Sequence, residues 1–253
     1  MSRVQEASDK EKIVFSWSGG KDSALALHEI LQSGRYEVVS LMTTVAGAYK
    51  RISHHGVREE LLDRQADAIG LPLEKVYLPV STGLPCTNAV FEELMGGVLA
   101  KFRAQGVLTV AHGDIFLQDL REYRERNLAK AGMKGLFPIW QRDVRELVET
   151  FIDLGFHAYL CCVEGEKLDR SFAGRPIDRT LLHDLPANVC PCGENGEYHS
   201  FVDDGPIFQR PVPVRVGEIV CRDNRYYADL VLGLDDVEGR PTEKIREDVI
   251  PPV

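Results

Sequence analysis

The sequence has no long apolar segment. No run of about 18 apolar residues occurs in its 253 residues, and its first twelve residues are mostly polar. A membrane-spanning helix needs about 20 apolar residues, and a secretory leader needs an apolar centre. We therefore expect a cytoplasmic protein that does not enter a membrane.

Positive charge is also scarce. The chain has 30 lysines and arginines against 39 aspartates and glutamates, which gives a formal net charge of -9. Proteins that hold nucleic acid through counterion release usually carry excess positive charge. A basic run at Arg121, Arg124, Arg126 and Lys130 is more typical of a solvated helix face. We expect no stable binding to nucleic acid.

Cysteines are too few for a disulfide scaffold, since the chain has only six. Cys190 and Cys192 form a C-x-C pair, which lacks the C-x₂-C spacing typical of zinc sites. Cys161 and Cys162 lie within an apolar run, where a cysteine usually acts as a small buried hydrophobe. The sequence therefore predicts free thiols and no zinc site.

Strand-like and helix-like segments alternate through the first half of the chain. The expected strands cover residues 13–15, 37–43, 75–80 and 107–111, and helix-periodic segments follow the first three. Strands that alternate with helices of this length imply parallel crossover connections. The predicted fold is α/β, with a doubly wound parallel sheet.

The pattern changes after Gly132. Residues 135–140 are typical of a linker, and Asp143 with Glu146 predicts the capped start of a helix over 144–154. A strand over 157–163, a short helix over 178–184 and a hairpin turned at Asp223-Asn224 follow. We predict an α/β domain over 1–135, a smaller α+β domain over 136–234 and an extended tail over 235–253.

The loop Ser18 to Ser23, with the sequence SGGKDS, joins the first strand to the first helix. Amide groups and the positive end of the helix converge there, which favours a bound anion such as phosphate. Gly19 and Gly20 permit close approach of the backbone, and Lys21 adds a positive charge. The loop is not a Walker A motif, because Lys21 is followed by Asp22. Asp22 could hold Mg²⁺ against phosphates or cap the helix.

Other strand ends carry polar residues as well. Ser16 ends the first strand, Thr43-Thr44 stand at the end of the second, and His112-Gly113-Asp114 end the fourth. In doubly wound sheets, ligands bind beyond the carboxyl ends of the strands. We therefore expect these residues to share one ligand crevice with the loop Ser18 to Ser23.

A second polar cluster lies at residues 190–201, with the sequence CPCGENGEYHSF. Glu194, Asn195, Glu197 and His199 could bind an ammonium-like or amide nucleophile, accept its protons and orient an acyl group. The alternative is an exposed β-hairpin loop with no chemical role. Because so many reactive side chains share twelve residues, we favour a catalytic segment.

The string S-G-G-x-D-S after a first strand resembles the PP-loop of the adenine nucleotide α-hydrolase-like, or HUP-type, superfamily, whose members cleave ATP to AMP and pyrophosphate. This resemblance implies that Ser18 to Ser23 bind the phosphates of ATP, with Mg²⁺ at Asp22. It also implies that Thr43 and Gly113-Asp114 line the adenosine site.

The segment C-G-E-N-G-E-Y-H-S-F-V, followed by D-G-P-I-F, resembles the diphthine-ammonia ligase family, here in a short stand-alone form. Tyr198 and Ser200 stand where Phe and Thr are usual. Members join ammonia to the carboxylate of diphthine, a modified histidine on translation elongation factor 2, through an adenylate. The resemblance runs from about Lys12 to Phe208. Further matches support it: His55-Gly56-Val57, Glu60-Leu61-Leu62, Gln65-Ala66, Gly113-Asp114-Ile115, Pro138-Ile139-Trp140, Leu168 and Gly174-Arg175.

The resemblance implies an ATP-dependent ligase with a protein substrate, an ammonia source and catalytic groups at Lys21, Asp22, Glu194, Asn195, Glu197 and His199. A homodimer is left open. One alternative is a PP-loop enzyme that thiolates or otherwise modifies tRNA, which would need a basic groove and a C-x-x-C pair. Another is a module that senses ATP or AMP without catalysis.

Overall fold

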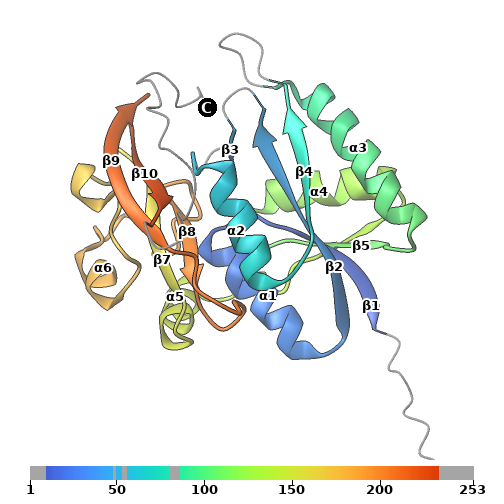
Figure 1. The fold of residues 1–253 in the computed structure, drawn as a ribbon, viewed down its shortest axis with the longest axis horizontal. Coiled ribbons are helices and arrows are strands. Elements are labelled where there is room, and N and C mark those ends of the chain that lie inside the picture. Colours follow the sequence, from blue (N-terminus) through green and yellow to red (C-terminus); the bar gives the residue numbers. More distant parts are fainter. Residues whose placement is uncertain (1–9, 48–49, 53–55, 80–85, 234–253) are drawn as a thin grey trace, which may run out of the picture.

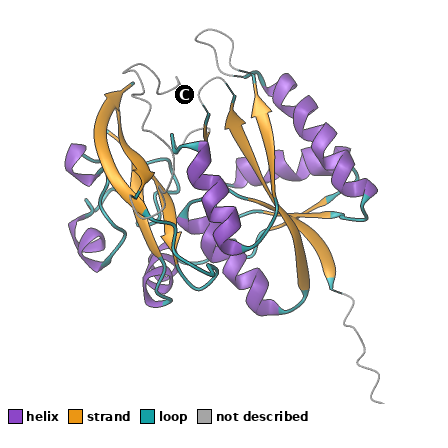
Figure 2. Ribbon diagram, viewed as in Figure 1, coloured by secondary structure: helices purple, strands orange, loops and turns teal. Residues whose placement is uncertain are grey.

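The structure is a computed structural model that describes residues 10–47, 50–52, 56–79 and 86–233. It contains two sheets that lie on either side of helices α1 and α2 (Figure 1). The predicted tail, His55 and the predicted end of the third strand at Val80 lie outside the described residues. Figure 2 shows the same view by secondary structure.

The larger sheet is mostly parallel. Its order is β3-β2-β1-β5-β6, with β4 paired to β2. The neighbours β1-β2, β1-β5, β2-β4 and β5-β6 are parallel, and only the short β3 runs antiparallel to β2. The strands are β1 (Glu11–Ser16), β2 (Tyr36–Ala46), β3 (Arg51–Ile52), β4 (Leu73–Leu78), β5 (Thr109–Ala111) and β6 (Lys134–Leu136).

Helices cover both faces of this sheet, as a doubly wound fold requires. The side chains of β1 alternate between the faces: Ile13 and Phe15 pack in the core beside α1 and α2, whereas Val14 packs with Leu99 and Phe102 of α3. The helices of the larger sheet are α1 (Lys21–Ser33), α2 (Glu59–Ile69), α3 (Asn88–Ala104) and α4 (Gln118–Lys130). The predicted fold class is confirmed.

The smaller sheet is antiparallel, with the order β8-β7-β10-β9. The predicted hairpin is present, and Asp223 and Asn224 turn it with φ of 47° and 60°, the left-handed values of a type I′ turn. Asp143 caps α5 by accepting hydrogen bonds from the amides of Arg145 and Glu146. The remaining elements are α5 (Val144–Asp153), β7 (His157–Glu164), the 3₁₀ turn η1 (Arg170–Phe172), α6 (Arg179–Asp184), β8 (Tyr198–Asp204), β9 (Val214–Arg222) and β10 (Arg225–Leu232).

The linker expected over residues 135–140 is a turn only in its second half, at residues 138–141. Lys134–Leu136 forms strand β6, which adds to the larger sheet beside β5. Three residues that include a glycine give no alternation from which to recognise a strand, so this pairing comes from tertiary contacts. One apolar cluster also joins both sheets, from Phe15 to Leu160 and Phe201. The division at residue 135 stays a prediction.

Candidate functional site

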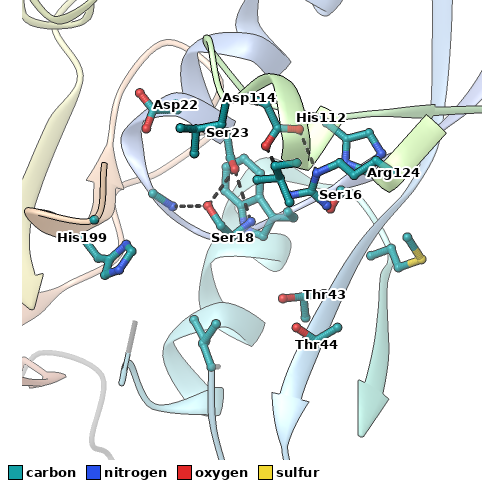
Figure 3. Close-up of a pocket in the computed structure, with 18 of the residues that line it drawn as sticks. Ser16, Ser18, Asp22, Ser23, Thr43, Thr44, His112, Asp114, Arg124 and His199 are labelled. Carbon is teal, nitrogen blue, oxygen red and sulfur yellow. Dashed lines mark hydrogen bonds and ion pairs between the residues drawn. The ribbon is translucent and has the colours of Figure 1, made fainter. Parts of the chain in front are cut away.

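A cavity of about 850 Å³ opens at the carboxyl ends of β1, β2 and β5 (Figure 3). It brings together the Ser18 loop, the ends of three strands and the segment around residue 194, which are far apart in the sequence. The predicted residues that line it are Ser16, Ser18, Gly20, Lys21, Asp22, Ser23, Thr43, Gly113, Asp114, Glu194 and His199. Gly19, Asn195 and Glu197 are not among the lining residues.

The loop Ser18 to Ser23 is held in a tight turn by its own hydroxyl groups. The Oγ atoms of Ser18 and Ser23 lie 2.7 Å apart, and the Gly20 amide donates to Ser18 Oγ at 3.2 Å. Helix α1 begins at Lys21 with Gly20 as its N-cap, so Asp22 is not the capping residue. The first amides of α1 point toward the cavity end of the helix, where its dipole favours an anion.

Gly19 has a structural role beneath the loop. Its φ is +79°, and a Cβ atom there would lie 2.7 Å from Oε1 of Gln65. Gln65 is fully buried, donates to Gly19 O at 3.0 Å and also donates to Val202 O. Its Oε1 accepts from Trp17 Nε1 at 3.0 Å. Gln65 therefore ties the loop to α2 and β8, a role that depends on partners too distant in sequence for a motif to indicate.

Lys21 connects the loop to the second polar segment. Its side chain is 4% exposed, and its Nζ donates to Asp22 Oδ2 at 2.8 Å and to the carbonyl oxygen of Cys192. Nζ also lies 5.1 Å from the centre of the Tyr198 ring. Burial lowers the pKa of Lys21, but the charge of Asp22, its hydrogen bond to Lys21 and smaller contributions from Tyr198 and Cys192 together hold the pKa above its ordinary value. Lys21 is therefore a fixed positive charge at the cavity wall.

Gly113 allows the end of β5 to approach the start of α1. A Cβ atom at Gly113 would lie 2.9 Å from the carbonyl carbon and oxygen of Asp22. The neighbouring Asp114 is buried and pairs with Arg124 of α4, with Nε and Oδ2 2.8 Å apart. The carboxyl end of β5 is thus packed directly against the loop Ser18 to Ser23.

Glu194 brings a carboxylate into the cavity. Its Oε1 accepts from the Ile115 amide at 2.9 Å, which fixes the segment against the loop after β5. Burial, with the negative charges of Asp22 and Asp114, raises the pKa of Glu194 to about 7, although the Ile115 amide and Lys21 oppose this. A carboxyl group with such a pKa can exchange protons near neutral pH.

Glu197 and Asn195 do not share this position. Glu197 is 4% exposed and accepts from the amides of Cys190 and Asn195, both at 3.0 Å. The Asn195 side chain donates to the same carboxylate at 3.1 Å. These contacts shape the loop that carries Glu194. His199, on β8, lines the cavity on the side opposite His112 and Arg124 (Figure 3).

The sequence indicates no role for Ser200, and it places His112 at the crevice only as part of the string His112-Gly113-Asp114. The Lys21 amide donates to Ser200 Oγ at 3.1 Å, so β8 supplies a hydroxyl to the start of α1. His112 is 6% exposed and lines the cavity at the end of β5. The string His112-Gly113-Asp114 at a strand end is the available signal for His112, whereas Ser200 acts through a contact 179 residues away.

The described residues contain no cluster of three or more His, Cys, Asp or Glu side chains able to hold a metal ion. Mg²⁺ that arrives with a nucleotide needs only one or two protein carboxylates, because phosphates and water complete its coordination. Both cavity aspartates are paired, Asp114 with Arg124 and Asp22 with Lys21, but the Asp22 side chain is the more exposed, at 27% against 10%. Asp22 is therefore the carboxylate that fits such a role. Within the described ranges, no helix is both long and apolar enough to cross a membrane.

Comparisons with known proteins give consistent matches along the chain. Residues 11–135 match the family described as Diphthamide synthase N-terminal domain, and residues 143–233 match Diphthamide synthase C-terminal domain. The chain is 27% identical to the diphthine–ammonia ligase of Bos taurus over 238 residues, which covers 83% of this chain and 85% of that protein. It is 27% identical to the diphthine–ammonia ligase of Danio rerio over 247 residues, covering 86% and 91%. The U34-tRNA thiolase NcsA from Methanococcus maripaludis aligns over 58% of each chain, with a TM-score of 0.38 and 16% identity.

Proposed function

Because the chain belongs to the diphthamide synthase family, we propose that it is an ATP-dependent ligase that adenylates a substrate carboxylate and then transfers ammonia to it. The observation that carries the proposal is that the Ser18 loop and the Glu194 segment meet in one cavity, joined by the hydrogen bond from Lys21 to Cys192. One segment suits phosphates and the other suits proton transfer, as the two half-reactions require.

In the first half-reaction, the loop Ser18 to Ser23 binds the β- and γ-phosphates of ATP. A substrate carboxylate oxygen attacks the α-phosphorus, the bond to the bridging oxygen breaks, and pyrophosphate leaves. Lys21 and the positive end of the α1 dipole are placed to stabilise the charge that develops on pyrophosphate. Mg²⁺ held at Asp22 would supply further neutralisation of the phosphate charge.

In the second half-reaction, ammonia attacks the carbonyl carbon of the acyl-adenylate, and AMP leaves as the amide forms. The nitrogen must lose a proton, and Glu194 is the cavity carboxylate whose pKa of about 7 suits an acceptor at neutral pH. His199 lines the same cavity and is the second candidate. Glu197 and Asn195 act by holding the loop that carries Glu194.

The proposed acceptor is diphthine on elongation factor 2, since the Bos taurus and Danio rerio relatives are named diphthine–ammonia ligases. The test uses elongation factor 2 that carries diphthine, incubated with the protein, ATP, Mg²⁺ and ammonium. Mass spectrometry of the modified peptide should show conversion of acid to amide, with one AMP formed for each amide. Failure to form the amide, with ATP left intact, would reject this acceptor and this activity.

A further inference from the structure

His112 combines burial with unused hydrogen-bonding capacity. Its side chain is 6% exposed, and neither Nδ1 nor Nε2 has a hydrogen-bond partner within the described part of the chain. Buried polar atoms are almost always paired, so an unpaired imidazole that lines a cavity points to a ligand. The proposed chemistry of phosphate activation and ammonia transfer gives His112 no role.

The ring of His112 is fixed in place. It stacks on Phe137 with ring centres 5.4 Å apart and planes inclined by 20°. Phe137 is in turn covered by the Arg121 guanidinium at 4.6 Å and meets Trp140 edge to face. A polar group held this firmly is ready to recognise a ligand without losing further side-chain freedom.

The surroundings of His112 select an uncharged ligand group. Burial and the nearby positive charge of Arg124 lower its pKa well below 6.5, so the ring is neutral and offers one donor and one acceptor. Arg124 is itself neutralised by Asp114. Phosphate has a better position at the start of α1, beside Lys21.

Apolar space continues past His112. A second cavity of about 860 Å³ lies between α3 and α4, and its walls include Leu99, Val110 and Leu128. The residues that line both cavities are Met42, Phe91, Met95, His112, Tyr123 and Arg124. Aromatic and thioether side chains pack well against a flat ring, so the junction offers apolar faces together with one polar edge.

We propose that His112 is a specificity-determining residue that hydrogen-bonds the purine base of the bound nucleotide, with the base seated where the two cavities join. This inference rests on the proposed function, because it takes ATP as the ligand and places its phosphates at the Ser18 loop. It adds to that function the residue that recognises the base, whereas the Ser18 loop recognises the phosphates. A ligand that lacks the base would leave the buried nitrogens of His112 unpaired, so the site should favour a ligand that carries the base.

The test measures affinity for ATP, for ribose 5-triphosphate, which lacks the base, and for inorganic tripolyphosphate. His112→Leu removes both polar atoms, His112→Gln keeps a donor and an acceptor, and His28→Phe is a matched control, because His28 packs edge-on against Phe156 and lines neither cavity. His112→Leu should weaken ATP binding about tenfold, the change expected for one hydrogen bond with a buried partner. Its affinity for tripolyphosphate should stay within about twofold.

Thermal unfolding gives an independent readout. Ligand-free His112→Leu should unfold at the same temperature as wild type or higher, because it no longer buries unpaired polar atoms. Its stabilisation by ATP should be smaller, and His112→Gln should fall between the two.

Equal affinity of wild type and His112→Leu for ATP would overturn the inference and leave the proposed function standing. If His112→Leu does not fold, the comparison of ligands on wild type replaces it: binding of ribose 5-triphosphate as tight as that of ATP would also overturn the inference. A wild type that binds neither ATP nor tripolyphosphate would instead reject the proposed function.

Discussion

Lys21 Nζ donates a hydrogen bond to the carbonyl oxygen of Cys192, a residue 171 positions further along the chain. This contact joins the loop that suits phosphates to the segment that carries Glu194. The positive charge is buried and balanced by Asp22. The two polar motifs of the sequence therefore form one site.

Replacing Lys21 tests the electrostatic part of the account. Lys21→Met keeps most of the side-chain volume but removes the charge that would face the leaving pyrophosphate. We expect pyrophosphate release to fall about 10²–10³-fold, the usual effect of losing one group that stabilises transition-state charge. Lys12→Met is the matched control, because Lys12 is exposed on the strand that leads to the same loop. Equal rates for the two variants would contradict this role.

Gly19→Ala tests the close packing beneath the loop. The new Cβ would need φ of +79° and would meet Gln65 Oε1 at 2.7 Å. We expect a loss of about 2–3 kcal/mol in the free energy of unfolding, measured in urea, together with weaker ATP binding. Gly34→Ala is the control, since φ is +65° there but nothing lies within 4 Å of the added atom. It should cost only about 1 kcal/mol.

Gln65→Leu tests the support of the loop from α2. The substitution removes the buried partner of Trp17 Nε1 and the side-chain donor to Val202 O, and it leaves Gly19 O with the Val202 amide alone. We expect a destabilisation of about 3 kcal/mol and a raised KM for ATP. Gln118→Leu should change stability by less than about 0.5 kcal/mol, because the Gln118 side chain is exposed and donates to Glu122 on the surface. Unfolding curves that coincide for the two variants would refute the role of Gln65.

The pH dependence follows from Glu194. Its pKa is raised to about 7, chiefly by burial, so the base form accumulates as pH rises through 7. Amide formation should rise between pH 6 and 8 when the concentration of free ammonia, rather than total ammonium, is held constant. Glu194→Gln should be slower and flat over this range. A rising profile that persists in the variant would assign the proton acceptor elsewhere.

The stability of the fold should fall as pH rises, whereas the rate of amide formation rises. The folded state holds the Glu194 proton more tightly than the unfolded state, in which the pKa of Glu194 is near 4.5. Ionisation therefore costs stability increasingly from about pH 4.5 to about pH 7 and by a constant amount above that. The free energy of unfolding of Glu194→Gln, measured relative to wild type, should increase across this window. A constant difference would show that the pKa of Glu194 is not raised.

Much of the fold can be predicted because its signals are local. Strand and helix periodicity indicates the doubly wound sheet, and Asp223-Asn224 indicates the hairpin. The expectation of a linker at strand β6 is wrong, because the strand depends on pairing with β5 rather than on its own three residues. Local patterns indicate an element only when the element largely stabilises itself.

The same distinction applies to the site. Lys21, Asp22 and Glu194 stand in recognisable motifs, and the structure places all three at one cavity. The sequence alone does not separate Glu194 from Glu197, since one faces the cavity and the other holds the loop through backbone amides. Gln65 and Ser200 act through partners on other elements, so their roles depend on tertiary structure alone.

The fate of the ATP phosphates tests the central claim most directly. With diphthine-bearing elongation factor 2, ammonium and ATP in ¹⁸O-enriched water, the account predicts AMP, pyrophosphate and amide in equal amounts. The AMP should contain no oxygen from water, because the carboxylate attacks the α-phosphorus. Formation of ADP and phosphate, or AMP that carries ¹⁸O, would contradict adenylation at this site.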